Sequence, residues 1–196
     1  MILDWELKPG SKILQEHLAQ RLSVSRTPLV KALRILESDG LVETAPNRGA
    51  FVRKFSKKEM LWMYDIREAL EGIAAREAAS IATDQQIEEL RDIFKDFSPP
   101  LENVDIEAYT TADIGFHQKI TELCQNQMLF QINTSFNILL RTYQEGLTRS
   151  PSRTLPEHMA IIDALSSHEE ELSENLMREH LRRAKRSFER RLLSEL

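Results

Sequence analysis

Four side chains in the second half of the sequence could hold a metal ion together. Asp113 and His117 are four residues apart, so both project from the same face if their segment is a helix. His158 and His180 lie on two later segments. One carboxylate with three imidazoles suits Zn²⁺, Ni²⁺ or Mn²⁺, and open coordination positions would accept a ligand carboxylate. Spacing alone also allows a simpler interpretation, in which the Asp-x-x-x-His pair decorates the surface and the other histidines are packing residues.

Helical patterns supply the elements that would bring these side chains together. The patterns predict helices over about 105–124 and 127–147. Gly115 lies in the first of these helices and suggests close packing there. Ser150-Pro151-Ser152 should separate two helices. No strand pattern occurs in this part, so we expect an all-α antiparallel bundle. Capping-box sequences predict four more helix starts, at Ser56–Glu59, Thr83–Gln86, Thr154–Glu157 and Ser167–Glu170.

The first sixty residues predict a different structure, a winged helix-turn-helix. Lys12–Leu22 fits a helix with leucines at four-residue spacing. Ser25 is a good N-cap for a second helix, which Asp39-Gly40 should end. Two β-prone runs then flank Pro46–Gly49, which is typical of a hairpin. The fold class is therefore mostly α, with an N-terminal winged helix-turn-helix followed by the helical bundle.

The charge distribution separates the same two regions. Residues 1–60 carry a net charge of +4 and residues 61–196 a net charge of −9. A basic front module on an acidic body fits contact with double-stranded DNA by the front part alone. Arg26 and Thr27 begin the second helix, whose N-terminus would enter the major groove, and Arg48 at the hairpin tip could reach a minor groove. Lys12, Lys31 and Arg34 could meet phosphates, although a solvated basic surface on a protein-interaction module is the alternative.

Other features limit the possible locations of the chain. The sequence has no apolar run of about eighteen residues and its N-terminus lacks the pattern of a signal peptide, so no membrane association is expected. Cys124 is the single cysteine, which excludes an intramolecular disulfide and favours a reducing compartment. Together these features predict a cytoplasmic protein.

The segment LKPGSKILQEHLAQRLSVSRTPLVKALRILESDGLVETAPNRGAFV resembles the DNA-binding domain of the GntR family of bacterial regulators. The resemblance implies that Arg26 and Thr27 read the operator and that Arg48 and Gly49 form the tip of the wing. It assigns residues 1–55 to this domain, with a shortened first helix. Val30 stands where the family usually has Arg, which could impair DNA binding. The expected DNA-binding residues are Ser25, Arg26, Thr27, Lys31, Arg34, Arg48 and Gly49.

The segments YDIREALEGIAAREAA, DIGFHQKI, PEHMAIIDAL and MREHL resemble, in this order, the FCD effector domain of the FadR branch of that family. The resemblance assigns residues 56–196 to an effector-binding and dimerisation domain. Its metal-binding pattern falls on Asp113, His117, His158 and His180. Arg67 is expected to clamp an anionic effector, with Arg141 as a weaker candidate. The alternative for Arg67 is a structural ion pair with Glu71 or Glu68.

These observations predict a homodimeric repressor that binds operator DNA and senses a small organic acid at a divalent metal ion. Two alternatives remain within the same class: the metal itself could be the signal, or DNA binding could be impaired. A metal-dependent hydrolase or lyase is the alternative from another class, since Asp with three His could activate water. A winged helix would have no part in such an enzyme, which disfavours it.

Overall fold

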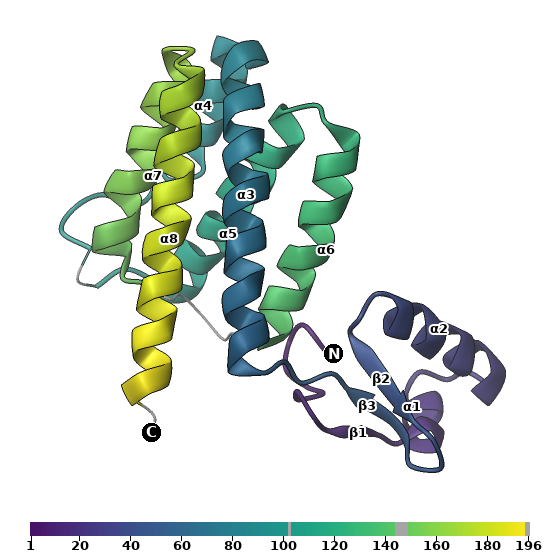
Figure 1. Cartoon of the computed structure of the whole chain (residues 1–196). Coiled ribbons are helices and arrows are strands. Elements are labelled where there is room, and N and C mark those ends of the chain that lie inside the picture. Colours follow the sequence, from purple (N-terminus) through teal and green to yellow (C-terminus); the bar gives the residue numbers. More distant parts are fainter. Residues whose placement is uncertain (102, 144–148, 195–196) are drawn as a thin grey trace. The chain divides into compact units, whose positions relative to one another are not determined.

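The computed structural model describes the backbone of residues 1–101, 103–143 and 149–194, and the side chains of 1–101, 103–135 and 149–191. These residues form eight α-helices and a small three-stranded sheet (Figure 1). The expected fold class, a winged helix-turn-helix followed by a helical bundle, is confirmed. Residues 1–58 form most of one compact unit, and residues 59–136 with 149–194 form most of the other. None of the described helices is both long and apolar enough to cross a bilayer.

The first unit contains two helices and an antiparallel sheet in the order β1-β3-β2. The hairpin is confirmed: β2 and β3 pair from Val42 opposite Val52 to Ala45 opposite Gly49. Its turn uses left-handed backbone at Asn47 and Gly49, with φ of 60° and 95°. The elements are β1 (Lys12–Ile13), α1 (Gln15–Arg21), α2 (Arg26–Ser38), β2 (Val42–Ala45) and β3 (Gly49–Val52).

The predicted helix over Lys12–Leu22 is wrong at its start. Lys12 and Ile13 pair with β3, and α1 begins only at Gln15. Ile13 is 3% exposed, because the strand turns its side chain into the core of this unit. Of the three leucines that suggested one helical face, only Leu18 is buried, whereas Leu14 and Leu22 are 62% and 50% exposed.

The turn between α1 and α2 contains a strained residue. Ser23 has a φ of +54°, in the left-handed region that favours glycine. Ser25 is the N-cap of α2, as expected, although its hydroxyl makes no capping hydrogen bond. Gly40, with a φ of +75°, follows the C-cap Asp39 and ends the helix.

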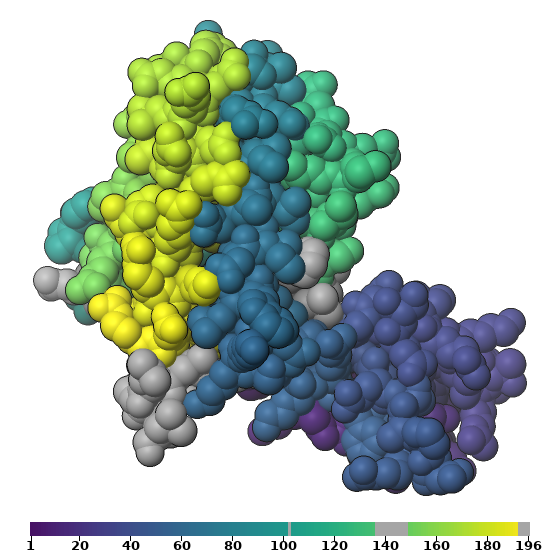
Figure 2. Space-filling model, viewed as in Figure 1, coloured from purple at the N-terminus to yellow at the C-terminus, as the bar shows by residue number. Residues whose placement is uncertain are grey.

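The second unit is a helical bundle around one large apolar core, formed by α3, α4, α5, α7, α8 and the first part of α6 (Figure 1). Its most enclosed side chains include Tyr109, Phe116, Leu165, Met177 and Phe188. Ion pairs such as Arg76–Glu174, Arg182–Glu68 and Lys185–Asp65 link α3 to α8, and the side chains of these two helices meet on one face (Figure 2). The helices are α3 (Lys57–Ile81), α4 (Asp84–Asp92), α5 (Ile106–Leu123), α6 (Gln127–Tyr143), α7 (Pro151–Ser166) and α8 (Glu170–Ser194).

The helix starts confirm some capping signals and correct others. Thr83 and Gln86 form the expected reciprocal box at the start of α4, and Asp105 caps α5 by accepting from two backbone N–H groups. The boxes at Thr154 and Ser167 are wrong. α7 begins earlier, at Pro151, because proline is favourable in the first turn, so Ser150-Pro151 marks the start of this helix. Ser167 is the C-cap of α7.

Two mid-helix glycines have opposite surroundings. A Cβ atom on Gly72 of α3 would lie 2.7 Å from Cγ of Arg178, whose guanidinium is held by Glu174. A Cβ atom on Gly115 of α5 would meet no atom of the described residues within 4 Å. The expectation of close packing at Gly115 is therefore wrong, and Gly72 is the position where the helices approach closely.

Replacing these glycines by alanine should therefore have opposite effects. Gly115→Ala should raise the free energy of unfolding by about 0.5–1 kcal/mol, because alanine loses less backbone entropy in a helix. Gly72→Ala should lower it, because Arg178 must move and break its ion pairs. Urea denaturation of both variants and the original protein measures the difference. A loss of stability in Gly115→Ala would contradict the open surroundings of that residue.

Candidate metal centre

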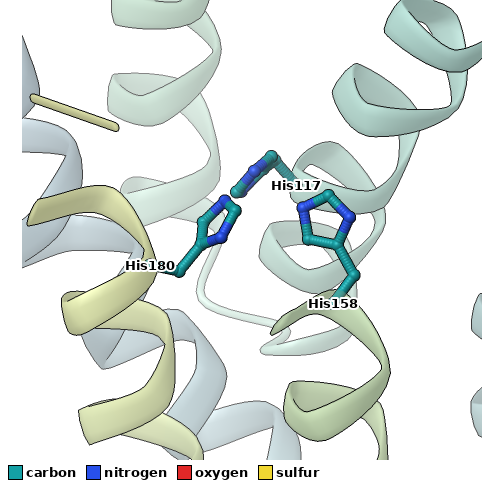
Figure 3. Close-up of side chains that lie close together, drawn as sticks. All are labelled: His117, His158 and His180. Carbon is teal, nitrogen blue, oxygen red and sulfur yellow. The ribbon is translucent and has the colours of Figure 1, made fainter. Parts of the chain in front are cut away.

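Three buried histidines from three helices meet inside the bundle. His117 comes from α5, His158 from α7 and His180 from α8, and one ring nitrogen of each lies within 4.8 Å of those of the other two. Their exposures are 4%, 0% and 4%. Figure 3 shows the three rings turned toward a common space. The three histidines are far apart in the sequence, so the packing of α5, α7 and α8 creates the cluster.

Asp113 completes the predicted set of four. It lies one turn before His117 on α5, and its Oδ1 is 3.4 Å from Nε2 of His158. Its side chain keeps 22% exposure, whereas the three imidazoles are almost fully enclosed. The structure therefore brings together one carboxylate and three imidazoles, the ligand types that the sequence suggested.

His180 is oriented by a carboxylate that the sequence analysis did not assign to the site. Nδ1 of His180 is 2.8 Å from Oε2 of Glu157, and Glu157 also accepts hydrogen bonds from Arg149 and Arg183. Burial alone would raise the pKa of Glu157, but these partners lower it well below its usual range. A carboxylate at Nδ1 favours a proton on that nitrogen, which leaves the lone pair on Nε2 for a metal.

His117 contacts a buried ion pair between two residues of α3. The Nε of Arg67 donates to Oε1 of Glu71 at 2.7 Å, and Oε2 of Glu71 lies 2.6 Å from Nδ1 of His117. This last contact is close, but its angle is not that of a hydrogen bond. Burial raises the pKa of Glu71, yet Arg67 and then His117 lower it to about 2, so Glu71 is a carboxylate. The structural ion pair between Arg67 and Glu71, which the sequence left as the alternative to an anion clamp, is thus observed.

His158 is the most enclosed of the rings. It stacks on Phe94 with 4.9 Å between ring centroids, and its Nδ1 is 3.4 Å from the hydroxyl of Tyr109. Its Nε2 is fully buried and has no hydrogen-bond partner among the described residues. Burial, followed by the nearby His180 and His117, lowers the pKa of His158 well below its usual value. The ring is therefore neutral at neutral pH, so one of its two nitrogens carries a lone pair that could bind a metal.

These features fit a divalent metal ion. A buried nitrogen without a partner is unfavourable, and coordination would satisfy it. Burial also lowers the pKa of His180, so this imidazole too favours the neutral form that binds metal. Sequence reasoning did not assign Tyr109, Phe94 or Glu157 to the site. The position of Glu157 next to His158 was the available signal for one of them.

The expected DNA-binding residues lie in the first unit. Ser25, Arg26 and Thr27 are exposed at the start of α2, where the missing side-chain cap leaves backbone N–H groups available to a phosphate. Lys31 and Arg34 are exposed further along the same helix, as is Lys12 in β1. Arg48 is exposed in the hairpin turn, with its guanidinium 5.8 Å from the ring centroid of Phe51, and Gly49 is half-buried beside it.

Arg141, the weaker candidate for contact with an effector, belongs to α6. Its side chain lies outside the part that the structure describes, so its role stays a prediction.

Comparison with protein families identifies two matching regions. A model described as the FCD domain matches residues 62–183, and one described as bacterial regulatory proteins of the gntR family matches residues 1–52. The Nta operon transcriptional regulator of Aminobacter aminovorans is 31% identical over 173 residues, which cover 87% of this chain and 81% of that protein.

Two further relatives are similar over most of their length. The HTH-type transcriptional repressor RspR of Escherichia coli is 26% identical over 178 residues, covering 89% of this chain and 78% of that protein. A probable D-xylose utilization operon transcriptional repressor of Paenarthrobacter nicotinovorans is 28% identical over 186 residues, covering 92% and 80%.

Solved structures show the same fold. E. coli McbR/YncC matches with a TM-score of 0.76 and 20% identity, over 97% of this chain and 92% of that chain. A GntR regulator from Rhodococcus sp. RHA1 matches with a TM-score of 0.72 and 24% identity, over 95% and 91%.

The contact between Glu157 and His180 leads to a test of metal binding. Glu157→Gln should weaken the binding of Zn²⁺, Ni²⁺ or Mn²⁺ by about 10- to 100-fold, because an amide orients the imidazole less firmly and makes it less basic. Competition with a chromophoric chelator measures the affinity. Glu179→Gln is the matched control, since Glu179 pairs with Arg183 and Arg186 on the surface of α8. Equal affinities in the two variants would show that Glu157 does not orient a ligand.

Proposed function

The chain belongs to the gntR family of bacterial regulatory proteins and carries an FCD domain, and from this premise we propose that it is a repressor controlled by a small organic acid at a metal ion. It is a DNA-binding transcriptional regulator and not an enzyme, because its family and relatives are regulators. The observation that carries the finer proposal is the cluster of three buried histidines beside Asp113.

The proposed metal ligands are Asp113, His117, His158 and His180. The ion would be Zn²⁺, Ni²⁺ or Mn²⁺, the metals that combine imidazole with carboxylate ligands. When bound, it supplies a positive charge to which the carboxylate of an acid can coordinate. Burial lowers the pKa of His158 and of His180, which favours the neutral form of these two imidazoles, and Glu157 orients His180. Glu71 lies 2.6 Å from Nδ1 of His117.

Arg67 is the proposed second contact of the acid. Its guanidinium is buried and already pairs with Glu71, so an incoming carboxylate would compete with Glu71 for it. Since Glu71 also contacts His117, this competition would reach the metal centre. Arg67 and Glu71 lie on α3, which begins five residues after β3 ends. A change at this ion pair therefore acts on the helix that continues directly from the wing. Arg141 remains a weaker candidate for the same role.

The proposed DNA contacts are made by α2 and the hairpin of the winged helix, within residues 1–55. Arg26 and Thr27 would read bases, with Ser25 at the N-terminus of the helix, while Lys31 and Arg34 would meet phosphates and Arg48 with Gly49 would enter a minor groove. A homodimer, formed through residues 56–196, would place two such helices about 34 Å apart along the duplex. Repression is proposed because two of the relatives are named as repressors. A cytoplasmic location is proposed because a bacterial regulator binds operator DNA in the cytoplasm.

Control by the acid requires two arrangements with different DNA affinities. The acid can change operator binding only by as much as it binds one arrangement more tightly than the other. The same energy links the sites in reverse, so operator DNA must change the affinity for the acid by the same factor.

The DNA-binding part of the proposal is tested at Arg26. Arg26→Ala should raise the dissociation constant for operator DNA by about 5- to 150-fold, which corresponds to the loss of about 1–3 kcal/mol of base contact. Its metal content should not change. Fluorescence anisotropy with the promoter nearest its own gene, at two salt concentrations, measures the affinity. Arg76→Ala in α3 is the control, and an equal effect of both substitutions would contradict the assignment.

The sensing part is tested by removing the metal ligands. The double substitution His158→Ala and His180→Ala, and separately treatment with a chelator, should abolish both metal binding and the rise in melting temperature that an organic acid causes in metal-loaded protein. The chelator covers the case in which the double variant does not fold. Operator affinity is then measured with metal alone and with metal plus acid. A change with metal alone favours the metal as the signal, and equal affinity with every acid contradicts acid sensing.

A further inference from the structure

Asn133 is a buried polar side chain that the functions assigned so far do not use. It lies on α6 with 1% exposure, and neither its amide nitrogen nor its amide oxygen has a hydrogen-bond partner among the described residues. Leu129, one turn earlier, is 6% exposed and belongs to the main core. Asn133 therefore continues the inward face of α6 at a position where an apolar side chain would be expected. An unsatisfied amide at such a position is unfavourable.

The hairpin of α5 and α6 places Asn133 level with His117. The two helices are joined by residues 124–126 and run in opposite directions (Figure 1). His117 lies eight residues before Gln125 and Asn133 lies eight residues after it. Since each helical residue advances 1.5 Å, both side chains are about 12 Å from the turn. Asn133 is thus at the same depth in the bundle as one of the proposed metal ligands.

A contact between the start of α6 and α3 gives an independent estimate of the depth of Asn133 in the bundle. Nδ2 of Asn126 donates to Oε2 of Glu77 at 3.3 Å, which fixes the start of α6 beside α3. The two helices run in opposite directions (Figure 1). Seven residues further along α6 is Asn133, and seven residues back along α3 is Leu70, about 10 Å from the contact in each case. Leu70 lies in the turn of α3 that carries Arg67 and Glu71.

We propose that Asn133 is a specificity-determining residue of the effector site and that the acid it selects carries a hydroxyl group. This inference rests on the proposed function, in which Arg67 and the metal hold the carboxylate. The amide of Asn133 offers both a donor and an acceptor. A second carboxylate could satisfy the donor alone, whereas one hydroxyl group can accept from Nδ2 and donate to Oδ1. The site therefore distinguishes a hydroxy acid from the same acid without its hydroxyl.

The test compares acids that differ by one hydroxyl group. Lactate is paired with propionate, and malate with succinate, and each is titrated into metal-loaded full-length protein by calorimetry. The original protein should bind the hydroxy acid of at least one pair about 10- to 100-fold more tightly. Asn133→Leu should bind both members of that pair equally. Gln131→Leu, an exposed position on the same helix, is the matched control and should keep the preference.

The outcomes separate this inference from the proposed function. A preference that survives in Asn133→Leu, or equal binding of both members by the original protein, overturns the assignment of Asn133 and leaves acid sensing intact. If no acid binds the original protein although it binds operator DNA, acid sensing fails and this inference fails with it. The melting temperature of ligand-free Asn133→Leu should not fall, because an unpaired amide is replaced by an apolar group. Asn133→Ala serves for the same titration if leucine does not fit.

Discussion

A cluster of polar groups enclosed by an apolar bundle is the constraint on which the second unit depends. Three imidazoles and the carboxylate of Glu71 lie where water cannot solvate them, so each must find a compensating partner. Arg67 compensates Glu71, Glu157 compensates His180, and His158 is left with an unused nitrogen. The polar groups and their partners come from α3, α5, α7 and α8. The helices that enclose the cluster are therefore the helices that the cluster fixes in place.

The two units differ in how they arrange their charged side chains. The first keeps its cations exposed on α2 and the hairpin, where a polyanion can reach them. The second unit holds many of its charges in ion pairs, several of which join α3 to α8 along the surface. The net charges of +4 and −9 over residues 1–60 and 61–196 reflect this division. The net charge of the whole chain, −5, does not reveal this division.

The sequence predicted the fold from local signals, and it predicted the grouping of Asp113 with three histidines mainly through the resemblance to the FCD domain. Asp113 and His117 share a helical face, Thr83 begins a capping box, and an Asn-Arg-Gly turn marks the hairpin. The two-residue strand at Lys12 was missed because it is too short to show a period, and three leucines imitated a helix across it. The contacts of Glu157 and Tyr109, and the isolation of the Asn133 amide, could not be predicted because they arise from packing between distant helices.

The enclosure of the histidines also has a kinetic consequence. His117, His158 and His180 are only 0–4% exposed, so an ion that they hold with the partly exposed Asp113 would exchange slowly with the solution, because these three ligands leave it only when the bundle opens locally. His180 is additionally held by a carboxylate that two arginines restrain, so its departure would break several contacts at once. Such an ion would stay bound through many encounters with metabolites. The metal would thus be a permanent part of the binding site, and the organic acid would be the ligand that binds and dissociates.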